Sequence, residues 1–403
     1  MNLNLVRKID YWIGVPLCFM FSVVNSISRF IPFRRKPNAT PRKILFIKLS
    51  EIGSIILSYS LIDLARKEYP QAKIFFLTFE RNKSIFELLK VIPEENILII
   101  RESPPHLFIW DTLRVIRKLN REKIDIAFDL ELFSRFTAIL AYLSSADKRI
   151  GFYRYHFEGL YRGNLLTHNI GHNPLIHISK SFLSLWQVVA MPEKMSPELE
   201  RKVEDREITL PKASAPKETI EQMYKRLSEF GVNDRSKIFL INPGDGMLPL
   251  REWPLENFIV LSKKILEDGK NYLIIVGKDE NSKDRKSLLL YDALKDKRCI
   301  NLCNNTTLSE LLALFYMAVA LIANDSGVTH ISSLTPVKKF IFFGPESPQI
   351  YSPLGENNWI IYSDFPCSPC FSAFNHRNSS CRDNNCLKAI KPEQVFALLK
   401  NHL

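Results

Sequence analysis

An apolar stretch, residues 318–323, is followed by Asn324 and then by Asp325, Ser326 and Gly327, and His330 comes three residues after Gly327. The apolar stretch predicts a buried parallel strand, and the residues after Gly327 can start a helix with His330 in its first turn. The first N–H groups of a helix and the positive end of its dipole bind anions, above all phosphates. The sequence therefore predicts a phosphate-binding site at Asp325, Ser326, Gly327 and His330.

Three further segments carry polar or small residues at the ends of predicted strands. Gly244 lies in a Gly-rich turn, and Arg251 shortly after it can hold a phosphate with its charged fork. Asp279 and Glu280 follow the next strand, where a carboxylate can accept hydrogen bonds from a ribose hydroxyl. Gly344-Pro345 forms a turn after another strand. Taken singly, each segment also fits an ordinary solvated turn. Ligands of open α/β sheets bind outside the carboxyl ends of the strands, so we expect these groups to share one site.

A second candidate site lies near the start of the chain, where the first predicted strand turns into the first predicted helix. The residues there read Ser50-Glu51-Ile52-Gly53-Ser54. Gly53 permits a tight turn or a close approach of the backbone, and Glu51 places a carboxylate at the edge of the sheet. An ordinary strand–helix junction with a solvated glutamate fits these residues equally well.

Predicted strands and helices must position these groups, and they alternate along the chain in two series. The first series has strand-like runs at 43–49, 73–79, 96–101, 124–130 and 149–153, with helical patterns between them. The second starts near residue 218 and has strand-like runs at 238–242, 272–276, 319–324 and 338–343. Such alternation is typical of parallel, doubly wound sheets. We predict an α/β chain with two Rossmann-like domains facing a cleft, at 41–205 and 206–403, preceded by a membrane-associating segment and linker at 1–40.

The order and spacing of the motifs are more specific than any one of them. The opening Lys-Ile-Leu-Phe-Ile-Lys-Leu-Ser-x-x-Gly is followed by an Asn-Pro-Gly turn with Arg-x-Trp-Pro, then by Asn-Asp-Ser-Gly-x-x-His and Phe-Gly-Pro-x-x-Pro. From about residue 42 to its end, the chain resembles glycosyltransferase family 9, the family of the lipopolysaccharide heptosyltransferases. The resemblance implies the GT-B fold and an inverting transfer without a catalytic metal ion, typically from ADP-heptose to a lipid-linked inner-core sugar.

The resemblance also implies roles for the residues at matching positions. Ser326, Gly327 and Arg251 would stabilise the negative charge on the departing pyrophosphate, a type of contact that contributes about 3–4 kcal/mol per good donor. Asp325 and His330 would hold the loop or contact the donor. In the same comparison Asp279 or Glu280 corresponds to the ribose-binding carboxylate, with Gly244, Gly344 and Pro345 in the loops nearby.

The general base departs from the family pattern. The family commonly has an aspartate directly after the glycine of its first motif, and this chain has Ser54 there. A serine hydroxyl does not accept a proton at neutral pH without help, so we assign the base to Glu51, which lies three residues earlier. The alternative is a catalytically weak or inactive protein of the same fold that binds a nucleotide sugar or a glycolipid.

The N-terminal segment is apolar and basic. Residues 1–43 contain eight basic residues and one acid, which is +7 of the formal net charge of +12, so nucleic acid is not an expected partner of the mildly basic remainder. Eighteen uncharged, mainly apolar residues lie between Asp10 and Arg29, near the lower limit for a spanning helix. We expect residues 5–36 to lie on the cytoplasmic face of the inner membrane. The alternatives are a helix packed on the protein itself and a cleaved signal peptide.

Four of the seven cysteines cluster in a loop at 367–386. Cys367, Cys370, Cys381 and Cys386 have the spacing Cys-x2-Cys-x10-Cys-x4-Cys, and His376 lies among them. Two thiolates separated by two residues can chelate one tetrahedral ion, so the spacing favours a structural zinc site that plays no part in catalysis. Two disulfides or four free thiols are the alternatives.

Overall fold

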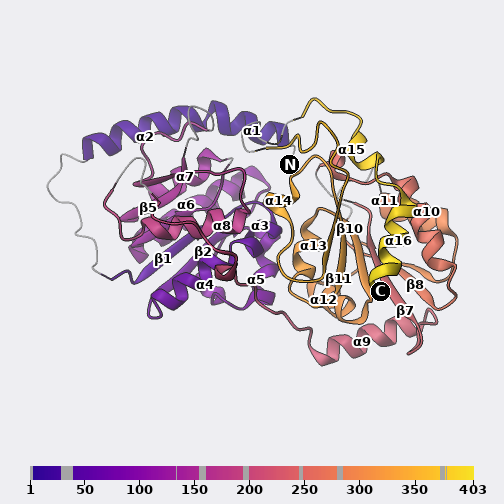
Figure 1. The fold of residues 1–403 in the computed structure, drawn as a ribbon. Coiled ribbons are helices and arrows are strands. Elements are labelled where there is room, and N and C mark those ends of the chain that lie inside the picture. Colours follow the sequence, from indigo (N-terminus) through magenta and orange to yellow (C-terminus); the bar gives the residue numbers. More distant parts are fainter. Residues whose placement is uncertain are drawn as a thin grey trace. The chain divides into compact units, whose positions relative to one another are not determined.

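The computed structural model describes residues 3–28, 40–132, 134–153, 160–193, 199–244, 248–278, 285–372, 377 and 379–403. The chain divides into two compact units, Met1–Thr209 and Leu210–Leu403. We call them the N-terminal unit and the C-terminal unit. Each contains one six-stranded parallel sheet with helices on both faces (Figure 1).

The sheet of the N-terminal unit has the order β3-β2-β1-β4-β5-β6. Its strands are β1 (Lys43–Ile47), β2 (Lys73–Phe79), β3 (Ile97–Ile100), β4 (Ile126–Asp129), β5 (Lys148–Tyr153) and β6 (His168–Gly171). The helices of this unit are α1 (Leu3–Trp12), α2 (Gly14–Ser28), α3 (Ile52–Leu57), α4 (Tyr59–Glu68), α5 (Lys83–Leu89), α6 (Pro105–Glu122), α7 (Arg135–Leu143) and α8 (Ile178–Ser184). Short 3-10 helices are η1 (Glu80–Asn82), η2 (Glu94–Asn96), η3 (Leu185–Val188) and η4 (Asp205–Glu207).

After Lys43, strand β1 is apolar because both faces of its sheet are covered. Leu45 and Ile47 belong to one buried cluster with residues of α6 and α7. On the other face, Phe46 stacks on Phe128 of β4 at 5.1 Å between ring centroids, and Phe128 stacks on Trp186 of η3 at 5.9 Å. Full burial of a Leu or Phe side chain contributes about 1.5–3 kcal/mol. A central parallel strand therefore reads as a continuous apolar run instead of an alternating one.

The sheet of the C-terminal unit has the order β12-β11-β10-β7-β8-β9. Its strands are β7 (Lys237–Asn242), β8 (Asn271–Ile275), β9 (Cys299–Asn301), β10 (Ala320–Asn324), β11 (Lys338–Phe343) and β12 (Asn358–Tyr362). The helices are α9 (Lys217–Ser228), α10 (Leu255–Leu266), α11 (Lys286–Leu294), α12 (Leu308–Met317), α13 (Gly327–Ser332), α14 (Pro348–Tyr351), α15 (Asn385–Lys388) and α16 (Pro392–His402), with the 3-10 helix η5 at Pro249–Arg251.

A fully buried tryptophan joins three elements of the C-terminal unit. Trp253 stacks on Phe342 of β11 at 4.2 Å and meets Phe258 of α10 edge-on at 4.9 Å. Its indole N–H donates to the carbonyl of Ile390, just before α16, at 3.0 Å. The residues that follow Arg251 are therefore held by the core of the unit.

Both sheets have one topology, and each has one point at which the strand order reverses. In the N-terminal unit this switch point lies between β1 and β4, and in the C-terminal unit between β7 and β10. Ligands of open α/β sheets bind at such points, beyond the carboxyl ends of the strands. The two switch points are therefore the places to look for functional groups.

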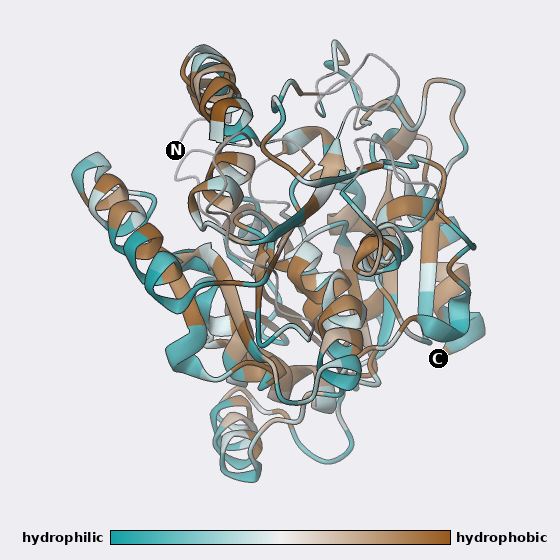
Figure 2. Ribbon diagram, turned by 90° about the vertical axis from the view of Figure 1, so that its left-hand side faces the viewer, coloured by the Kyte–Doolittle hydropathy of each residue, from teal (hydrophilic) through white to brown (hydrophobic). Residues whose placement is uncertain are grey.

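Helices α1 and α2 pack on the N-terminal unit along one face only. Gly14, Cys18 and Asn25 are the buried residues of α2, at helical spacing, and Cys18 packs against Ile139 of α7 and Leu165. Residues Leu5–Ser28 are long and apolar enough to cross a membrane by length and composition. In Figure 2 the topmost helix, α2, is mostly brown and pale. The basic residues 29–36 lie outside the described residues.

The predicted α/β class and the two doubly wound sheets are confirmed, with differences at the edges. The sequence patterns missed strands β6, β9 and β12 and helices α11, α14 and α15. All three strands lie at sheet edges. Strands β6 and β9 are short and contain polar residues, so they lack the continuous apolar run of a central strand, whereas β12 has one after Asn358. One predicted helix in the N-terminal unit is two helices, α3 and α4, which meet at Ser58.

Candidate functional site

Two buried asparagines hold the loops at the switch point of the C-terminal unit. Asn324, at the end of β10, accepts a hydrogen bond from the Trp253 backbone N–H and donates one to the Pro243 carbonyl, both at 2.8 Å. Asn242, at the end of β7, donates to the Val276 carbonyl at 2.8 Å and accepts from the Ser326 hydroxyl at 3.1 Å. These neutral amides join the ends of three strands without using a charged group.

The position of the Asn242 side chain requires a glycine at position 277. The φ of Gly277 is +120°, and a Cβ atom there would come within 2.2 Å of the Asn242 amide nitrogen. A side chain at this position would therefore displace Asn242 and disturb the turn that follows β8.

The charged groups of this edge meet at Asp325. Arg251 Nη1 lies 3.1 Å from Asp325 Oδ2, and His330 Nε2 lies 3.9 Å from Asp325 Oδ1. The Asp325 side chain is 4% exposed, whereas that of Arg251 is 14% exposed. A buried carboxylate between an arginine and a histidine is suited to orient them, and the arginine is the group of the pair nearer to solvent.

The residues after Asp325 open the short helix α13. The Thr329 hydroxyl donates to the Ser326 carbonyl at 2.6 Å, which fixes the first turn. Gly327 is exposed, and a Cβ atom there would meet no atom within 4 Å. Space therefore lies open before the first N–H groups of α13, which have no acceptor inside the helix. Because the helix has only six residues, the local N–H groups matter more than a long helix dipole.

The structure brings together most, but not all, of the residues predicted for this site. Arg251, Asp325 and His330 are neighbours, and Ser326 is tied to the end of β7. Half-buried Gly244 follows β7. Asp279 and Glu280 lie outside the described residues. Gly344 and Pro345 follow β11 but pack toward the cysteine loop, since a Cβ on Gly344 would come within 2.6 Å of Leu387.

The switch point of the N-terminal unit is built around a buried ion pair. Lys48 Nζ lies 2.8 Å from Glu131 Oε2, and both side chains are less than a tenth exposed. The other oxygen of Glu131 accepts from the backbone N–H groups of Leu49 and Ser50 and from the Ser50 hydroxyl, at 2.8–3.0 Å. Burial opposes ionisation of Glu131, but Lys48 and these hydrogen bonds outweigh it, so the Glu131 pKa is lowered.

A second buried ion pair lies beside the first. Arg162 Nη1 lies 3.2 Å from Asp129 Oδ2, and Arg162 also donates to the carbonyls of Phe152 and Glu131. Burial raises the pKa of Asp129 to about 6, although the Arg162 charge partly opposes this. The Asp129 side chain is not exposed at all, so it cannot touch a ligand. The two ion pairs join the end of β4 and the residues just after it to neighbouring segments of the same unit.

Glu51 is the carboxylate at this edge that reaches solvent. It is half-buried and directly precedes α3, and the Ser54 hydroxyl donates to its Oε2 at 3.2 Å. Its backbone has φ +65° and ψ 108°, which is rare for a residue with a side chain. Such backbone conformations cost about 1–3 kcal/mol and cluster at functional sites. The positive φ falls on Glu51, whereas Gly53 is buried inside α3.

Several residues that form these sites received no role in the sequence prediction. Lys48, Asn242, Gly277 and Asn324 stand within or beside its motifs, whereas Asp129, Glu131 and Arg162 were not singled out. Polar residues at the end of a predicted strand were the signal that singled out Asp325. The same signal at 129–131 would have identified Asp129 and Glu131.

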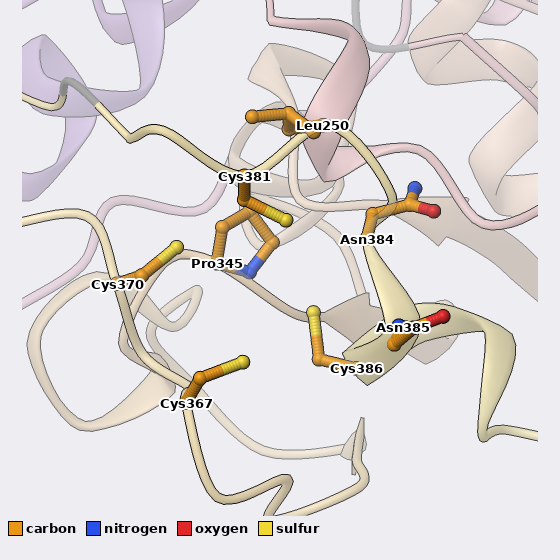
Figure 3. A pocket seen from close by; sticks show the side chains of 8 residues that line it. All are labelled: Leu250, Pro345, Cys367, Cys370, Cys381, Asn384, Asn385 and Cys386. Atoms are coloured by element: carbon orange, nitrogen blue, oxygen red, sulfur yellow. The ribbon is translucent and has the colours of Figure 1, made fainter.

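The four clustered cysteines line one cavity of about 50 Å³ together with Leu250, Pro345, Asn384 and Asn385. In Figure 3 their sulfur atoms point toward a common space. Within the described part of the chain, no three His, Cys, Asp or Glu side chains already lie together as a metal-binding group. His376 lies outside the described residues. The predicted zinc site is therefore a convergence of thiols and has no ready-made coordination sphere.

The sequence of the chain is similar to those of known glycosyltransferases. The family model described as "Glycosyltransferase family 9 (heptosyltransferase)" matches residues 112–379, roughly two thirds of the chain. Lipooligosaccharide heptosyltransferase 2 of Campylobacter jejuni serotype O:2 is 29% identical over 170 residues, 41% of this chain and 51% of that protein. The chain thus matches about half the length of that relative. Lipopolysaccharide heptosyltransferase 2 of Salmonella typhimurium is 22% identical over 79% of this chain and 87% of that protein.

A solved structure shows the same fold. The ADP-heptose lipopolysaccharide heptosyltransferase II of Escherichia coli superposes with a TM-score of 0.68 at 18% identity, covering 89% of this chain and 98% of that one. At this identity the likeness concerns the fold alone. It confirms the GT-B fold expected from the sequence.

Proposed function

The chain belongs to glycosyltransferase family 9, and on that premise we propose that it transfers a heptose-like sugar from a nucleotide sugar of the ADP-heptose type to a lipid-linked glycan such as the lipopolysaccharide inner core. The transfer inverts the sugar configuration and requires no catalytic metal ion. The observation that carries the proposal is the Arg251–Asp325 pair at the switch point of the C-terminal unit. The names of the relatives support the choice of sugar and acceptor.

The C-terminal unit binds the donor through its pyrophosphate. As the bond from the sugar to the pyrophosphate breaks, negative charge grows on the departing phosphate oxygens. The Arg251 guanidinium, oriented by Asp325, and the N–H groups at Gly327 are placed to stabilise that charge. Because the asparagine frame and Trp253 hold these groups in place, they need little rearrangement during the reaction.

The N-terminal unit supplies the general base, Glu51. Of the three carboxylates at its switch point, Asp129 and Glu131 are buried in ion pairs, and only Glu51 is more than slightly exposed. Glu51 takes the proton of the acceptor hydroxyl as that oxygen attacks the anomeric carbon. General-base catalysis of this kind contributes about 10²–10⁴-fold to a rate.

A nucleotide-sugar-binding protein without transfer activity is the second candidate. It is favoured by Ser54, which stands where the family commonly has an aspartate and which donates its hydroxyl hydrogen to Glu51. In this alternative the donor site is used and the acceptor hydroxyl is never deprotonated.

A transfer assay separates the two candidates. Sugar transfer and ADP release are measured with ADP-heptose and a lipid-linked inner-core acceptor for the wild type, Glu51→Gln and the exposed control Glu95→Gln. We expect Glu51→Gln to lose about 10²–10⁴-fold in kcat with unchanged ADP affinity, and Glu95→Gln to match the wild type. Equal, slow donor hydrolysis in all three proteins, without transfer, would establish the binding protein instead.

We also propose that α1 and α2 lie on the cytoplasmic surface of the inner membrane. Between Leu5 and Ile27 this segment exposes ten large apolar side chains: Leu5, Ile9, Tyr11, Trp12, Ile13, Phe19, Met20, Val23, Val24 and Ile27. Basic residues flank the segment in the sequence, as suits anionic headgroups. Exposed apolar side chains and protein contacts along one face favour an interfacial helix.

The polar contacts of α1 and α2 with the rest of the N-terminal unit favour helices that lie on the membrane over helices that span it. Asp10 pairs with Arg135 at 2.9 Å, and Asn25 donates to the Asn164 carbonyl at 2.9 Å. A Cβ atom on Gly163 would come within 1.9 Å of the Ser22 hydroxyl, so this segment touches α2 closely. A spanning α2 would draw these polar groups into the hydrocarbon core at a cost of several kcal/mol, or else break the contacts.

Vesicle flotation tests this placement. The full chain is mixed with phosphatidylglycerol-containing or purely zwitterionic vesicles, and the exposed residues Trp12 and Phe19 are replaced together by glutamate. We expect binding to the anionic vesicles to fall by about tenfold or more, because two exposed apolar side chains that would enter the bilayer are replaced by charged ones. Leu289→Glu, at an exposed position on α11, is the matched control and should bind like the wild type. Unchanged binding of the double variant would refute the placement.

A further inference from the structure

Glu51 lies between two segments of the N-terminal unit that are held by hydrogen bonds. Helix α3 begins directly after Glu51, and the Glu51 carbonyl accepts from the Ile55 N–H at 3.3 Å. On the other side, the Leu49 N–H, the Ser50 N–H and the Ser50 hydroxyl donate to Oε1 of Glu131 at 2.8–3.0 Å, and we call these bonds the Glu131 cap. Glu51 is therefore the residue at which the chain turns from the capped segment into the helix.

The backbone of Glu51 takes up this turn. Its φ of +65° and ψ of 108° lie in a region that residues with a side chain rarely adopt, and such a conformation persists only where the surroundings impose it. Gly53, which could adopt a positive φ without strain, lies inside α3. Because the direction of a Cα–Cβ bond follows from the backbone, the Glu131 cap also sets the direction in which the Glu51 side chain points.

The backbone of Glu131 is itself held on both sides. Its N–H donates to Asp129 Oδ1 at 3.1 Å, and its carbonyl accepts from Arg162 Nη2 at 2.6 Å. Arg162 precedes Gly163, where a Cβ atom would come within 1.9 Å of the Ser22 hydroxyl oxygen of α2. The Arg162 segment is thus packed closely against α2. Glu131 is therefore a fixed point from which its side chain holds residues 49 and 50.

We propose that Glu131 is a positioning residue that aims the Glu51 carboxylate at the acceptor hydroxyl. This step rests on the proposed function, in which Glu51 is the general base. Glu131 acts through Glu51 and not on a ligand, because its side chain is only 4% exposed and its second oxygen pairs with Lys48 Nζ. A general base has to lie within hydrogen-bond reach of the proton that it takes, and a displacement of about 1 Å can cost about 10²-fold in rate.

Two double variants isolate the cap from the ion pair. The cap-keeping variant, Lys48→Met with Glu131→Gln, removes both buried charges but retains an amide oxygen that can accept from residues 49 and 50. The cap-free variant, Lys48→Met with Glu131→Leu, removes the charges and the acceptor together. Replacement of a whole buried ion pair by apolar groups of similar volume is often neutral for stability, whereas removal of one partner is costly. We therefore expect both double variants to fold.

Urea unfolding tests the positioning without reference to catalysis. Glu51→Gly is introduced into the wild type, the cap-keeping variant and the cap-free variant. In the first two proteins we expect it to raise the urea midpoint by about 0.3 M or more, because glycine adopts a positive φ without strain. In the cap-free variant residue 51 can relax, so glycine should bring no gain. An equal gain in all three proteins, or no gain in any of them, would overturn the proposal.

If the cap-free variant does not fold, Glu131→Asp takes its place. Aspartate keeps the negative charge beside Lys48, but its carboxylate is one methylene farther from residues 49 and 50. The expectation is the same: Glu51→Gly should bring a smaller gain in the urea midpoint than it does in the wild type. An unchanged gain would show that the cap does not impose the conformation of residue 51.

Sugar transfer tests the consequence for catalysis. With ADP-heptose and the lipid-linked inner-core acceptor, we expect the cap-free variant to have a kcat lower than that of the cap-keeping variant by about tenfold or more, at equal ADP affinity. Equal kcat values in the two double variants would overturn the role of Glu131 in aiming the base. If the wild type transfers no sugar, the proposed function fails, whereas the urea comparison still decides whether Glu131 holds residue 51.

Discussion

The two switch points of the chain occupy the same place in the same topology, yet they use charge differently. At the β1–β4 edge, Lys48, Glu131, Asp129 and Arg162 are buried and pair with one another. At the β7–β10 edge, neutral Asn242 and Asn324 hold the loops, and one Arg–Asp pair lies nearer to solvent. Paired charges hold the first edge together, whereas neutral amides hold the second edge and the Arg251–Asp325 pair lies beside them. The first edge is therefore structural apart from Glu51, and the second is suited to an anion.

The largest effect that this comparison predicts is on stability. Glu131→Ala would leave the buried Lys48 ammonium and three donors without their acceptor, so we expect a loss of about 3–5 kcal/mol in the free energy of unfolding. Urea unfolding measures it. Glu122→Ala is the matched control, because Glu122 pairs with Lys43 at the surface and should cost at most about 1 kcal/mol. Equal losses in the two variants would mean that the buried Lys48–Glu131 pair stabilises the β1–β4 edge no more than a surface pair does.

At the other edge the expected effect is on activity. We expect Arg251→Ala to lower kcat/KM by about 10²–10³-fold, because a preorganised cation on the leaving group is removed. Its unfolding free energy should fall less than that of Glu131→Ala, since His330 stays near Asp325. Arg298→Ala breaks a surface pair with Asp296 in the same unit and should keep full activity. A loss of activity that merely follows a loss of folded protein would contradict the assignment.

The pH dependence of stability distinguishes the buried pair further. Burial raises the pKa of Asp129 from 3.8 to about 6, so between about pH 4 and 6 the folded chain keeps a proton that the unfolded chain releases. This contribution to the unfolding free energy is present at low pH and is lost as pH rises through 6, by up to about 3 kcal/mol. Urea unfolding of the wild type and Asp129→Asn from pH 4 to 8 measures it. Parallel pH profiles would show that Asp129 does not titrate in this range.

The smallest predicted effect concerns the strained residue at the first edge. Glu51→Gly should raise the free energy of unfolding by about 1 kcal/mol, because glycine adopts a positive φ without the strain of a side chain. Glu51→Ala removes the same carboxylate but keeps the strain, so it should show no such gain in urea unfolding. If both variants gain equally, the carboxylate and not the backbone is the source of the cost.

Local patterns were enough to predict much of the fold and part of the site. Strand β2 was predicted to the residue, because burial on both faces makes a central strand one apolar run. The patterns also grouped Arg251 with Asp325, which lie 3.1 Å apart. The edge strands β6 and β9 escaped prediction because they are only four and three residues long and each contains polar residues. Strand β12 does carry an apolar run, Trp-Ile-Ile-Tyr, and was missed despite it.

The sequence by itself determined the two parallel sheets, the family and the residues that end the strands. The tertiary structure decided which of those residues meet. Lys48 and Glu131 are 83 positions apart, and they pair only because the strand order reverses between β1 and β4. The same holds for Asn242 and Ser326, 84 positions apart across β7 and β10. Apolar periodicity is written in neighbouring residues, whereas contact between strand ends depends on the order and register of the whole sheet.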